Sequence, residues 1–488
     1  MLIHSPDGGI GKVVPSKFKE WLYDDTVHID QMRREYNEYI KLLLYFLDPA
    51  KIDYINEFEE KQKDKPQPDC YKPGHPDYFN SDKVLDVQHL LYKVLQKPGI
   101  RRRIIAAVCA WEGVSFATES RLDAIQDAAV LTNVLITGVL KSADGKSSEF
   151  VFAPLPNFIF TRDISIVIND YILLSNAATA ARERESLLMK FISFYLLFEE
   201  NQDKIIEISE SSDFFLLDEK EQQYYKTSVE GGDVMMIAPN HLLIGCSERT
   251  TASAIDEIIH AVFRNNKTGI EKISVIKIPR MRAIMHIDTV FTHVRKDTWV
   301  LYGKMSEQVM HEKNQQQHSY YLHFLDKQVA ADYETAEILR FYKPLRTEYE
   351  ASKNYRQDVS HIIKGLEGLL RNISTEDYGI PEGEIKIIYS GNNVFPYDER
   401  EQWTDSCNLL ALKDGVVVGY DRNDETFKGF EAKGFSVIRA SDLFKKFENK
   451  ELTPADVKDT LILLPSAELS RARGGAHCMS MPLLREKI

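Results

Sequence analysis

The hydrophobic residues of the chain follow two different periods, and each period predicts its own kind of element. From residue 84 onward, an apolar stripe with the spacing of an amphipathic helix is formed by Val87, Leu90, Leu91, Val94 and Leu95. Residues 104–111 and 122–140 have helical patterns too, so residues 84–141 predict a small all-helical unit. Another helix is expected near the start of the chain, over residues 29–46.

Later in the chain, short β-branched runs alternate with helical patterns. The expected strands are 164–168, 234–237, 242–245, 273–278, 299–302, 385–389, 416–420 and 435–438, and the expected helices are 186–200, 252–263 and 333–341. Such alternation is typical of an α/β protein, for which an open, doubly wound sheet is the first expectation. No glycine-rich phosphate loop lies at a strand-to-helix turn, so nucleotide binding has no support.

Two polar segments interrupt this alternation. Residues 62–77 contain Pro66, Pro68, Pro73 and Pro76. Proline fits neither a helix interior nor a central strand, so this density predicts a loop or linker. Residues 305–372 are polar and favour helix, and we expect an inserted helical segment there.

Composition narrows the choice of partners and compartment. The formal net charge is −13, from 61 lysines and arginines against 74 aspartates and glutamates. An acidic chain is a poor counterion for phosphate, so neither nucleic acid nor an anionic membrane is an expected partner. Five cysteines without a CxxC pair argue against a disulfide framework or a zinc ribbon. No signal peptide or membrane-spanning run is visible, which predicts a cytoplasmic protein with free thiols.

Four short segments carry reactive side chains, namely LPNFIFTRD (155–163), EGGD (230–233), HIDT (286–289) and RARGGAHCM (471–479). In the last segment Cys478 follows two glycines, which let the backbone approach a ligand closely. Arg471 and Arg473 place positive charge near the sulfur and would favour the nucleophilic thiolate. The alternative interpretation is a glycine-rich turn with an incidental surface thiol.

The other three segments also allow two interpretations each. On a strand, His286 and Asp288 would point to the same face and offer a general acid–base beside a carboxylate. A structural histidine paired with a carboxylate is the alternative, and a metal site is a third, although three ligands at metal spacing are not evident. EGGD, with Glu230 and Asp233, reads most simply as a turn that begins a strand. FTRD, with Asp163, reads most simply as a salt-bridged strand end.

Taken together and in this order, the four segments resemble the arginine deiminase family. The resemblance also covers LIHSPDG (2–8), LYDDT (22–26), AARERES (180–186), CSERT (246–250) and residues 392–423. It implies a five-bladed, pseudo-symmetric α/β propeller with an inserted helical domain, in place of an open sheet. The implied division is a first propeller module with the proline-rich loop at 1–83, the helical domain at 84–145, and the remaining modules at 146–488, with a helix-rich insertion near 305–372.

The resemblance also implies a role for each of nine residues. Cys478 matches the nucleophile, and His286 matches the general acid and base with Glu230 beside it. Asp163 and Asp288 match the two carboxylates that hold the substrate guanidinium. The groups that hold the substrate's α-carboxylate are matched by Asn157, Arg182 and Arg249, and Arg473 matches a mobile gate and further carboxylate ligand.

The implied reaction is hydrolysis of free L-arginine to L-citrulline and ammonia through a thiouronium on the cysteine. The matched carboxylate ligands argue for free arginine over agmatine, which lacks a carboxylate, and over peptidyl-arginine, which has an amide there. No metal or organic cofactor is expected, and a homo-oligomer is. Two alternatives stay open: an amidinotransferase or hydrolase of another guanidino acid on the same scaffold, and a non-catalytic arginine-binding protein.

Overall fold

The computed structural model describes residues 1–142, 147–210, 212–265, 267–306, 309, 338–343, 356–358, 363 and 365–485. The insertion expected at 305–372 therefore lies mostly outside the described residues, although helix α15 (Gly365–Glu376) begins within it. The described part of the helix expected at 333–341 is a strand, β13 (Ile338–Tyr342), so that prediction is wrong there.

The described residues form a mixed α/β fold with several small sheets in place of the open, doubly wound sheet that alternation alone suggested. Strands β1 (Leu2–Ile3) and β2 (Leu85–Asp86) form one two-stranded sheet. Strands β3 (Val139–Lys141) and β4 (Ser148–Phe150) form another. One three-stranded sheet contains β5 (Ser165–Ile168), β6 (Tyr171–Leu174) and β7 (Ile205–Ile206). The other contains β11 (Phe291–Arg295), β12 (Thr298–Leu301) and β15 (Lys386–Tyr389). The five-stranded sheet contains β8 (Val234–Ala238), β9 (His241–Cys246), β10 (Lys272–Lys277), β13 and β14 (Arg356–Asp358). The four-stranded sheet contains β16 (Leu410–Lys413), β17 (Val416–Tyr420), β18 (Ser436–Arg439) and β19 (Thr460–Leu464).

Four of these sheets repeat one connection. Each begins with an antiparallel hairpin, namely β5–β6, β8–β9, β11–β12 and β16–β17. The second strand of each hairpin then pairs in parallel with a later strand, namely β7, β10, β15 and β19. A parallel partner requires a crossover, and helices supply it, for example α10 (Ala252–Arg264) between β9 and β10.

The helices agree with most of the expected positions. They are α1 (Phe18–Trp21), α2 (Ile29–Leu47), α3 (Ile52–Lys61), α4 (Val87–Leu95), α5 (Pro98–Trp111), α6 (Phe116–Asp123), α7 (Ala128–Thr137), α8 (Ala180–Ile192), α9 (Glu219–Tyr225), α16 (Tyr397–Trp403), α17 (Asp424–Ala432) and α18 (Ala440–Glu448), besides α10 and α15. The expected helix 29–46 and the stripe that gives α4 are confirmed. The helix expected at 122–140 is wrong as one element, because Asp127 caps the start of α7 and Gly138 ends it at φ 70°. Helices α4–α7 occupy residues 87–137, while their assignment to a separate domain stays a prediction.

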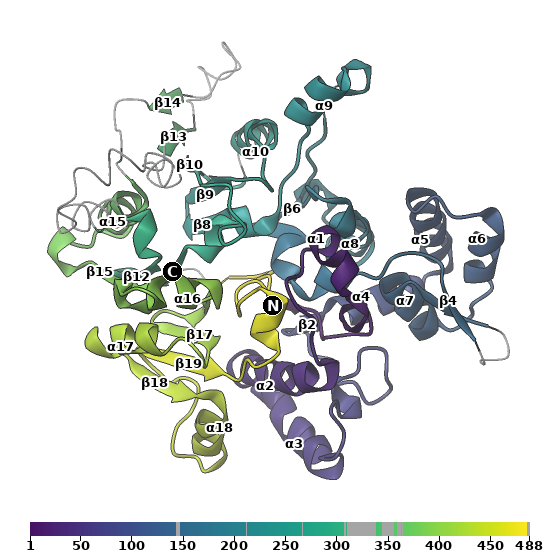
Figure 1. Cartoon of the computed structure of the whole chain (residues 1–488), viewed down its shortest axis with the longest axis horizontal. Coiled ribbons are helices and arrows are strands. Elements are labelled where there is room, and N and C mark those ends of the chain that lie inside the picture. The colour runs from purple at the N-terminus through teal and green to yellow at the C-terminus, as the bar shows by residue number, and fades with distance from the viewer. Residues whose placement is uncertain are drawn as a thin grey trace.

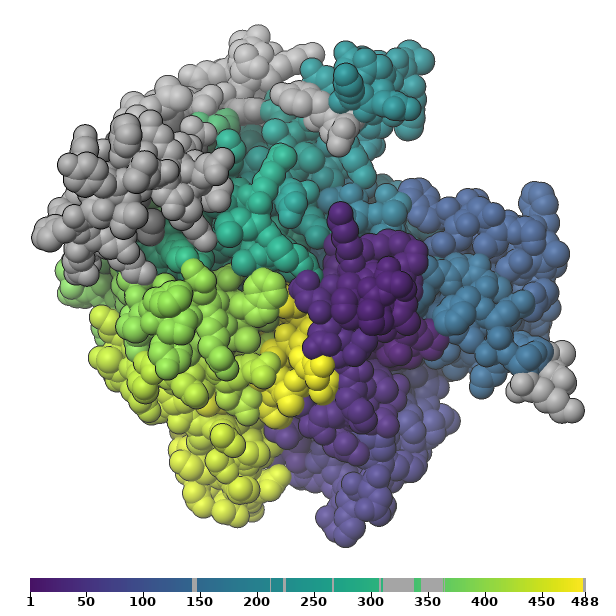
Figure 2. All heavy atoms as spheres, in the orientation of Figure 1, coloured from purple at the N-terminus to yellow at the C-terminus, as the bar shows by residue number. Residues whose placement is uncertain are grey.

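The first strand and a segment near the end of the chain meet in the middle of the molecule. In Figure 1 the C-terminal segment (yellow) lies beside the N-terminal segment (purple), and the sheets are arranged around them. Leu2 and Met481 form an antiparallel bridge, and Ile3 and Met479 belong to one hydrophobic cluster. Figure 2 shows the yellow segment at the surface between the purple and the green parts. Among the described residues, no helix combines the length and the apolar character that crossing a membrane would need.

A buried carboxylate on α2 joins the first part of the chain to the last. Glu35 is 1% exposed and accepts hydrogen bonds from the backbone N–H groups of Glu468 and Leu469, each at 2.9 Å. We predict that Glu35→Ala lowers the free energy of unfolding by about 2–4 kcal/mol, because two buried N–H groups lose their acceptor. Guanidinium denaturation measures the change.

The matched control is Glu57→Ala on α3, which removes an exposed carboxylate paired with Lys61. Its effect is expected to stay within about 0.5 kcal/mol. Equal stability of the two variants would contradict the role given to Glu35.

Candidate active site

Three of the candidate residues lie in turns that come just before the first strand of a repeated hairpin. Asp163 ends a 3-10 helix before β5, Glu230 precedes another before β8, and His286 precedes a third before β11. Because the hairpins occupy equivalent places in their sheets, these turns converge on one pocket. The pocket is lined by Asn157, Asp163, Arg182, Glu230, Arg249, His286, Arg473 and Cys478. The ninth predicted residue, Asp288, lies with its Oδ2 3.8 Å from the Sγ of Cys478.

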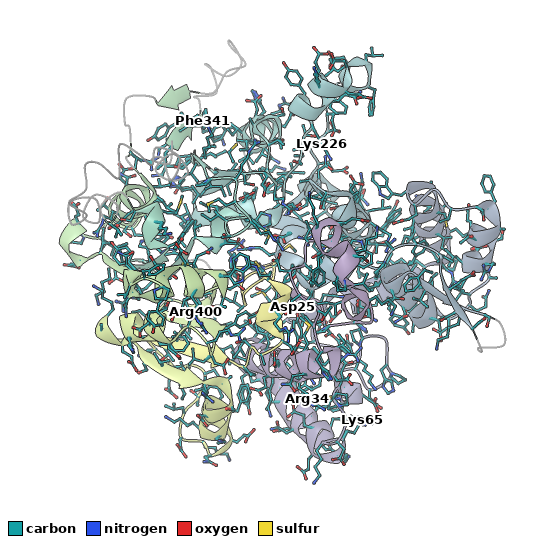
Figure 3. All side chains as sticks on the ribbon, viewed as in Figure 1. Asp25, Arg34, Lys65, Lys226, Phe341 and Arg400 are labelled. Atoms are coloured by element: carbon teal, nitrogen blue, oxygen red, sulfur yellow. The ribbon has the colours of Figure 1, made fainter. Side chains whose placement is uncertain are left out.

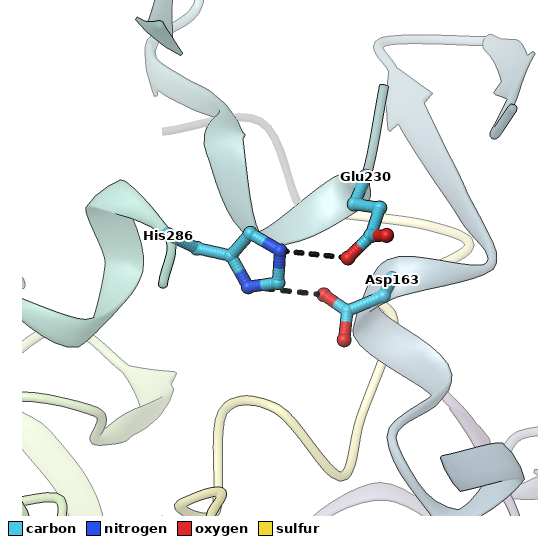
Figure 4. A group of neighbouring side chains, drawn as sticks. All are labelled: Asp163, Glu230 and His286. Atoms are coloured by element: carbon cyan, nitrogen blue, oxygen red, sulfur yellow. Dashed lines mark hydrogen bonds and ion pairs between the residues drawn. The ribbon is translucent and has the colours of Figure 1, made fainter. Parts of the chain in front are cut away.

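His286 is buried between two carboxylates, as Figure 4 shows. Its Nε2 lies 2.9 Å from Oε2 of Glu230, and its Nδ1 lies 3.7 Å from Oδ1 of Asp163. Burial alone would lower the pKa of His286, but the negative charges of Asp163, Glu230 and Asp233 outweigh burial and raise it to about 10. The imidazole is therefore a cation at neutral pH and has a proton to give.

The local structure around His286 differs from the strand that HIDT suggested. Residues Ile287–Thr289 form a 3-10 helix, so His286 and Asp288 do not share one strand face. His286 contacts Glu230, while Asp288 contacts Cys478. The prediction of a shared strand face is wrong, although His286 lines the pocket and Asp288 contacts Cys478, which lines it too.

Asp163, Glu230 and His286 also form a possible metal site that spacing along the sequence did not reveal. One ligand atom from each lies within 4.8 Å of the others. A metal requires the neutral imidazole, and a pKa of about 10 for His286 means that a metal would have to displace a firmly held proton. The trio therefore fits an imidazolium between carboxylates better than it fits a cation site.

Cys478 is buried and is held as a thiol by its surroundings. Burial raises its pKa well above the usual range, and the nearby carboxylates of Asp288, Asp163 and Asp405 add to the effect. Arg162 acts in the opposite direction. The protein alone therefore does not stabilise the thiolate.

The two arginines expected to place positive charge near Cys478 make their direct contacts elsewhere, although Arg473 lines the pocket with Cys478 and interacts with it electrostatically. Arg471 is half-exposed and lies 2.7 Å from Asp25, which Figure 3 places beside the yellow segment. Arg473, at φ 65°, donates to the carbonyl of Trp403 at 2.5 Å and stacks over the indole ring at 3.5 Å from its centroid. Its Nε lies 3.7 Å from Asp24.

Asp288 has one oxygen paired and one free. Its Oδ2 lies 2.9 Å from Nδ1 of His477, and its buried Oδ1 has no hydrogen-bond partner among the described residues. Burial alone would raise the pKa of Asp288, but the His477 hydrogen bond and the nearby positive charges lower it. The carboxylate therefore stays ionised and presents an unused oxygen.

The three groups expected to hold an α-carboxylate differ in how far they are already engaged. Arg182 donates to Asp163 at 2.5 Å and to Glu185 at 2.8 Å. Asn157 donates to the carbonyl of Trp21 at 3.0 Å. The Nη1 of Arg249 is buried without a hydrogen bond among the described residues, and Oε1 of Glu230 lies 3.8 Å from it. Arg249 is therefore the most available anion partner of the three.

Sequence reasoning gave no role to three other residues that shape the site. Asn408 accepts the N–H of Cys478 at 3.0 Å, and its amide donates to the carbonyl of Asp288 at 3.0 Å. The backbone N–H of Arg162 donates to the carbonyl of Cys478 at 3.0 Å. Asp405 lines the pocket. All three lie within segments that carry the family resemblance, but nothing in the local pattern separates them from structural residues.

Comparison with known proteins agrees with the resemblance. Residues 126–485 match the family model described as arginine deiminase. An arginine deiminase of Borrelia garinii subsp. bavariensis is 25% identical over 100% of this chain and 95% of its own length. One from Latilactobacillus sakei is 26% identical over 100% of this chain and 96% of its own length. A solved N-terminal domain of ArgZ, an arginine dihydrolase from cyanobacteria, aligns at 14% identity over 68% of this chain and 78% of its own, with a TM-score of 0.37, too low to inform the fold.

Glu230 is the carboxylate that contacts the His286 ring most closely, which makes its removal informative. We predict that Glu230→Gln lowers the pKa of His286 from about 10 to below about 9, because a charged hydrogen-bond acceptor becomes neutral. NMR titration of the imidazole measures the pKa directly.

Glu248→Gln serves as the control, since it removes an exposed carboxylate from the nearby turn. A histidine whose pKa is raised on folding stabilises the folded protein at low pH, and this stabilisation is lost as the pH rises through the folded-state pKa. The loss of stability in Glu230→Gln should therefore be larger at about pH 6 than above about pH 10. An unchanged His286 titration would contradict the charge pair.

Proposed function

This chain belongs to the arginine deiminase family, and from that premise we propose that it hydrolyses free L-arginine to L-citrulline and ammonia. Cys478 is the proposed nucleophile and His286 the proposed general acid and base. Asp163 and Asp288 are proposed to hold the guanidinium, with Glu230 fixing the imidazole.

The observation that carries the proposal is a pair of buried polar atoms that have no hydrogen-bond partner among the described residues. Oδ1 of Asp288 is an acceptor beside the thiol, and Nη1 of Arg249 is a donor. Leaving either group buried and unpaired costs free energy, so both are suited to a ligand. A guanidino acid supplies a cation for the first and an anion for the second.

The guanidinium is planar and permanently charged, so it needs both orientation and activation. Two carboxylates, Asp163 and Asp288, are able to accept its N–H groups and fix its plane. Its positive charge also offsets the carboxylates that hold Cys478 as a thiol. Binding of the substrate therefore favours loss of the Cys478 proton to solvent, which gives the thiolate when it is needed.

The reaction then proceeds in two halves. The thiolate of Cys478 forms an S–C bond with the central guanidinium carbon, the imidazolium of His286 protonates the departing nitrogen, and the C–N bond breaks to release ammonia. Neutral His286 next takes a proton from water, whose oxygen bonds to the thiouronium carbon. The C–S bond breaks and the added oxygen loses its remaining proton to solvent, which returns the thiolate and releases citrulline.

We propose that the protein selects L-arginine by binding its α-carboxylate. A buried carboxylate needs a cation or hydrogen-bond donors, and Arg249 offers an unused donor in the pocket. Asn157 and Arg182 line the same pocket and complete the proposed set, and Arg473 is the proposed gate. Agmatine would leave the Nη1 donor of Arg249 without a carboxylate partner.

The proposal extends to the architecture. The four repeated sheets, together with β1–β2, are counted as the five modules of an α/β propeller, with α4–α7 inserted after the first. The repeated hairpin and crossover support this count. A homo-oligomeric state and a cytoplasmic location stay predictions.

Cys478→Ser tests the nucleophile. We predict a loss of citrulline formation of at least about a thousandfold, because a serine hydroxyl has no comparable access to the anion at neutral pH. Colorimetric ureido and ammonia assays measure both products.

Cys246→Ser is the control, since that thiol is half-buried on β9 and does not line the pocket. Full activity of Cys478→Ser would exclude the proposed mechanism.

Arg249→Gln tests substrate choice. We predict that it lowers kcat/KM for L-arginine by about 10- to 100-fold, since a charge-assisted contact with the carboxylate is lost, and changes turnover of agmatine little. Steady-state kinetics on both compounds gives the comparison. An equal loss on both would mean that Arg249 does not contact the carboxylate.

A further inference from the structure

One carboxylate in the pocket has no use in the proposed mechanism. Asp405 is 8% exposed and lines the pocket that contains Cys478, Arg249 and Asn157. Its Oδ2 is buried and has no hydrogen-bond partner among the described residues. Burial raises the pKa of Asp405 to about 7, and only Arg473 opposes the effect. An unpaired buried carboxylate of this kind is a binding site for a cation.

The other carboxylates near Cys478 each have a partner for at least one oxygen. Asp163 accepts from Arg182, and Glu230 lies against His286. Asp288 contacts His477 and the thiol. Asp405 makes no such contact with the described residues and is left for the ligand.

Arg473 is the obvious protein partner, but its donors are directed elsewhere. It donates to the carbonyl of Trp403, stacks on that ring and lies near Asp24. It makes no ion pair with Asp405. The charge of Arg473 therefore reaches Asp405 without a hydrogen bond between them.

Asp405 is fixed with respect to the nucleophile. It adopts φ 65° in the turn after α16, a conformation that aspartate tolerates better than most residues. Its carbonyl accepts the N–H of Asn408 at 3.0 Å, and the amide of Asn408 accepts the N–H of Cys478 at 3.0 Å. A ligand whose reacting carbon lies at Cys478 therefore meets Asp405 at a set position.

We infer that Asp405 binds the α-ammonium group of the amino-acid substrate. This inference rests on the proposed function, because it takes the guanidinium to be held at Asp163 and Asp288 and the carboxylate at Arg249. L-Arginine has three charged groups, and the α-ammonium is the one left without a partner. Asp405 thereby makes the site selective for an α-amino acid over a guanidino acid that lacks the amino group.

The experiment compares L-arginine with 5-guanidinopentanoate, which differs only by loss of the α-amino group. In Asp405→Asn, kcat/KM for L-arginine is expected to fall by about 10- to 100-fold, because a charge-assisted contact is lost. For 5-guanidinopentanoate the fall is expected to stay below about threefold, since the missing contact was never made. Asp25→Asn, which removes an exposed carboxylate paired with Arg471, is the control and should change neither value.

Two outcomes overturn the inference. An equal fall on both compounds would mean that Asp405 acts through Arg473 or through the turn. If the wild-type protein had the same kcat/KM for L-arginine and 5-guanidinopentanoate, no group of the protein would bind the α-ammonium.

A binding measurement separates this inference from the proposed function. Calorimetry on Cys478→Ser protein gives the Kd of each compound without turnover. Weaker binding of 5-guanidinopentanoate, with the difference lost in Cys478→Ser/Asp405→Asn, supports the inference; equal Kd values overturn it. If Asp405→Asn does not fold, the preference of Cys478→Ser protein between the two compounds decides. Whether the wild type makes citrulline at all tests the proposed function alone.

Discussion

Buried carboxylates need cations, and this requirement connects the parts of the pocket. Asp163, Glu230 and Asp288 are each at most 5% exposed, and an ionised carboxylate at such depth is stable only when it is paired. The partners come from different sheets and helices: His286 precedes β11, and Arg182 lies on α8. The charge pairs therefore hold the leading turns of separate sheets against one another, and under the proposed function the same carboxylates bind a guanidinium.

The same constraint leaves the free protein poorly able to react. Burial and the surrounding carboxylates keep Cys478 as a thiol, and the proton on His286 is firmly held. A bound guanidinium would favour the thiolate of Cys478, because it brings positive charge close to Asp288, whose Oδ1 has no hydrogen-bond partner among the described residues. In the proposed mechanism, activation of Cys478 thus depends on the charge of the substrate. A neutral molecule of similar shape would leave the thiol unactivated.

Much of the local structure could be predicted from the sequence, because patterns such as Val87 to Leu95 and residues 234–237 report burial directly. The assembly of small sheets could not, since two-residue strands such as β1 and β7 leave no periodic signal and depend on distant partners such as Met481. The nine candidate residues came from a resemblance; the structure brings eight of them into one pocket and places Asp288 beside Cys478. The protonation states of these residues could not be predicted from the sequence. The pKa of Cys478, for example, depends on the charges of Asp163, Asp288 and Asp405, whose positions in space the order of the chain does not give.

The central claim is that Cys478 carries the substrate's guanidino carbon through a covalent intermediate. The most direct test is to mix the protein with L-arginine, quench it with acid within the first turnovers, digest it, and weigh the peptides. The account predicts that the peptide containing Cys478 gains the mass of arginine less ammonia, while the peptides containing Cys70, Cys109, Cys246 and Cys407 are unchanged. Formation of citrulline with no mass gain on the Cys478 peptide at any quench time would contradict it.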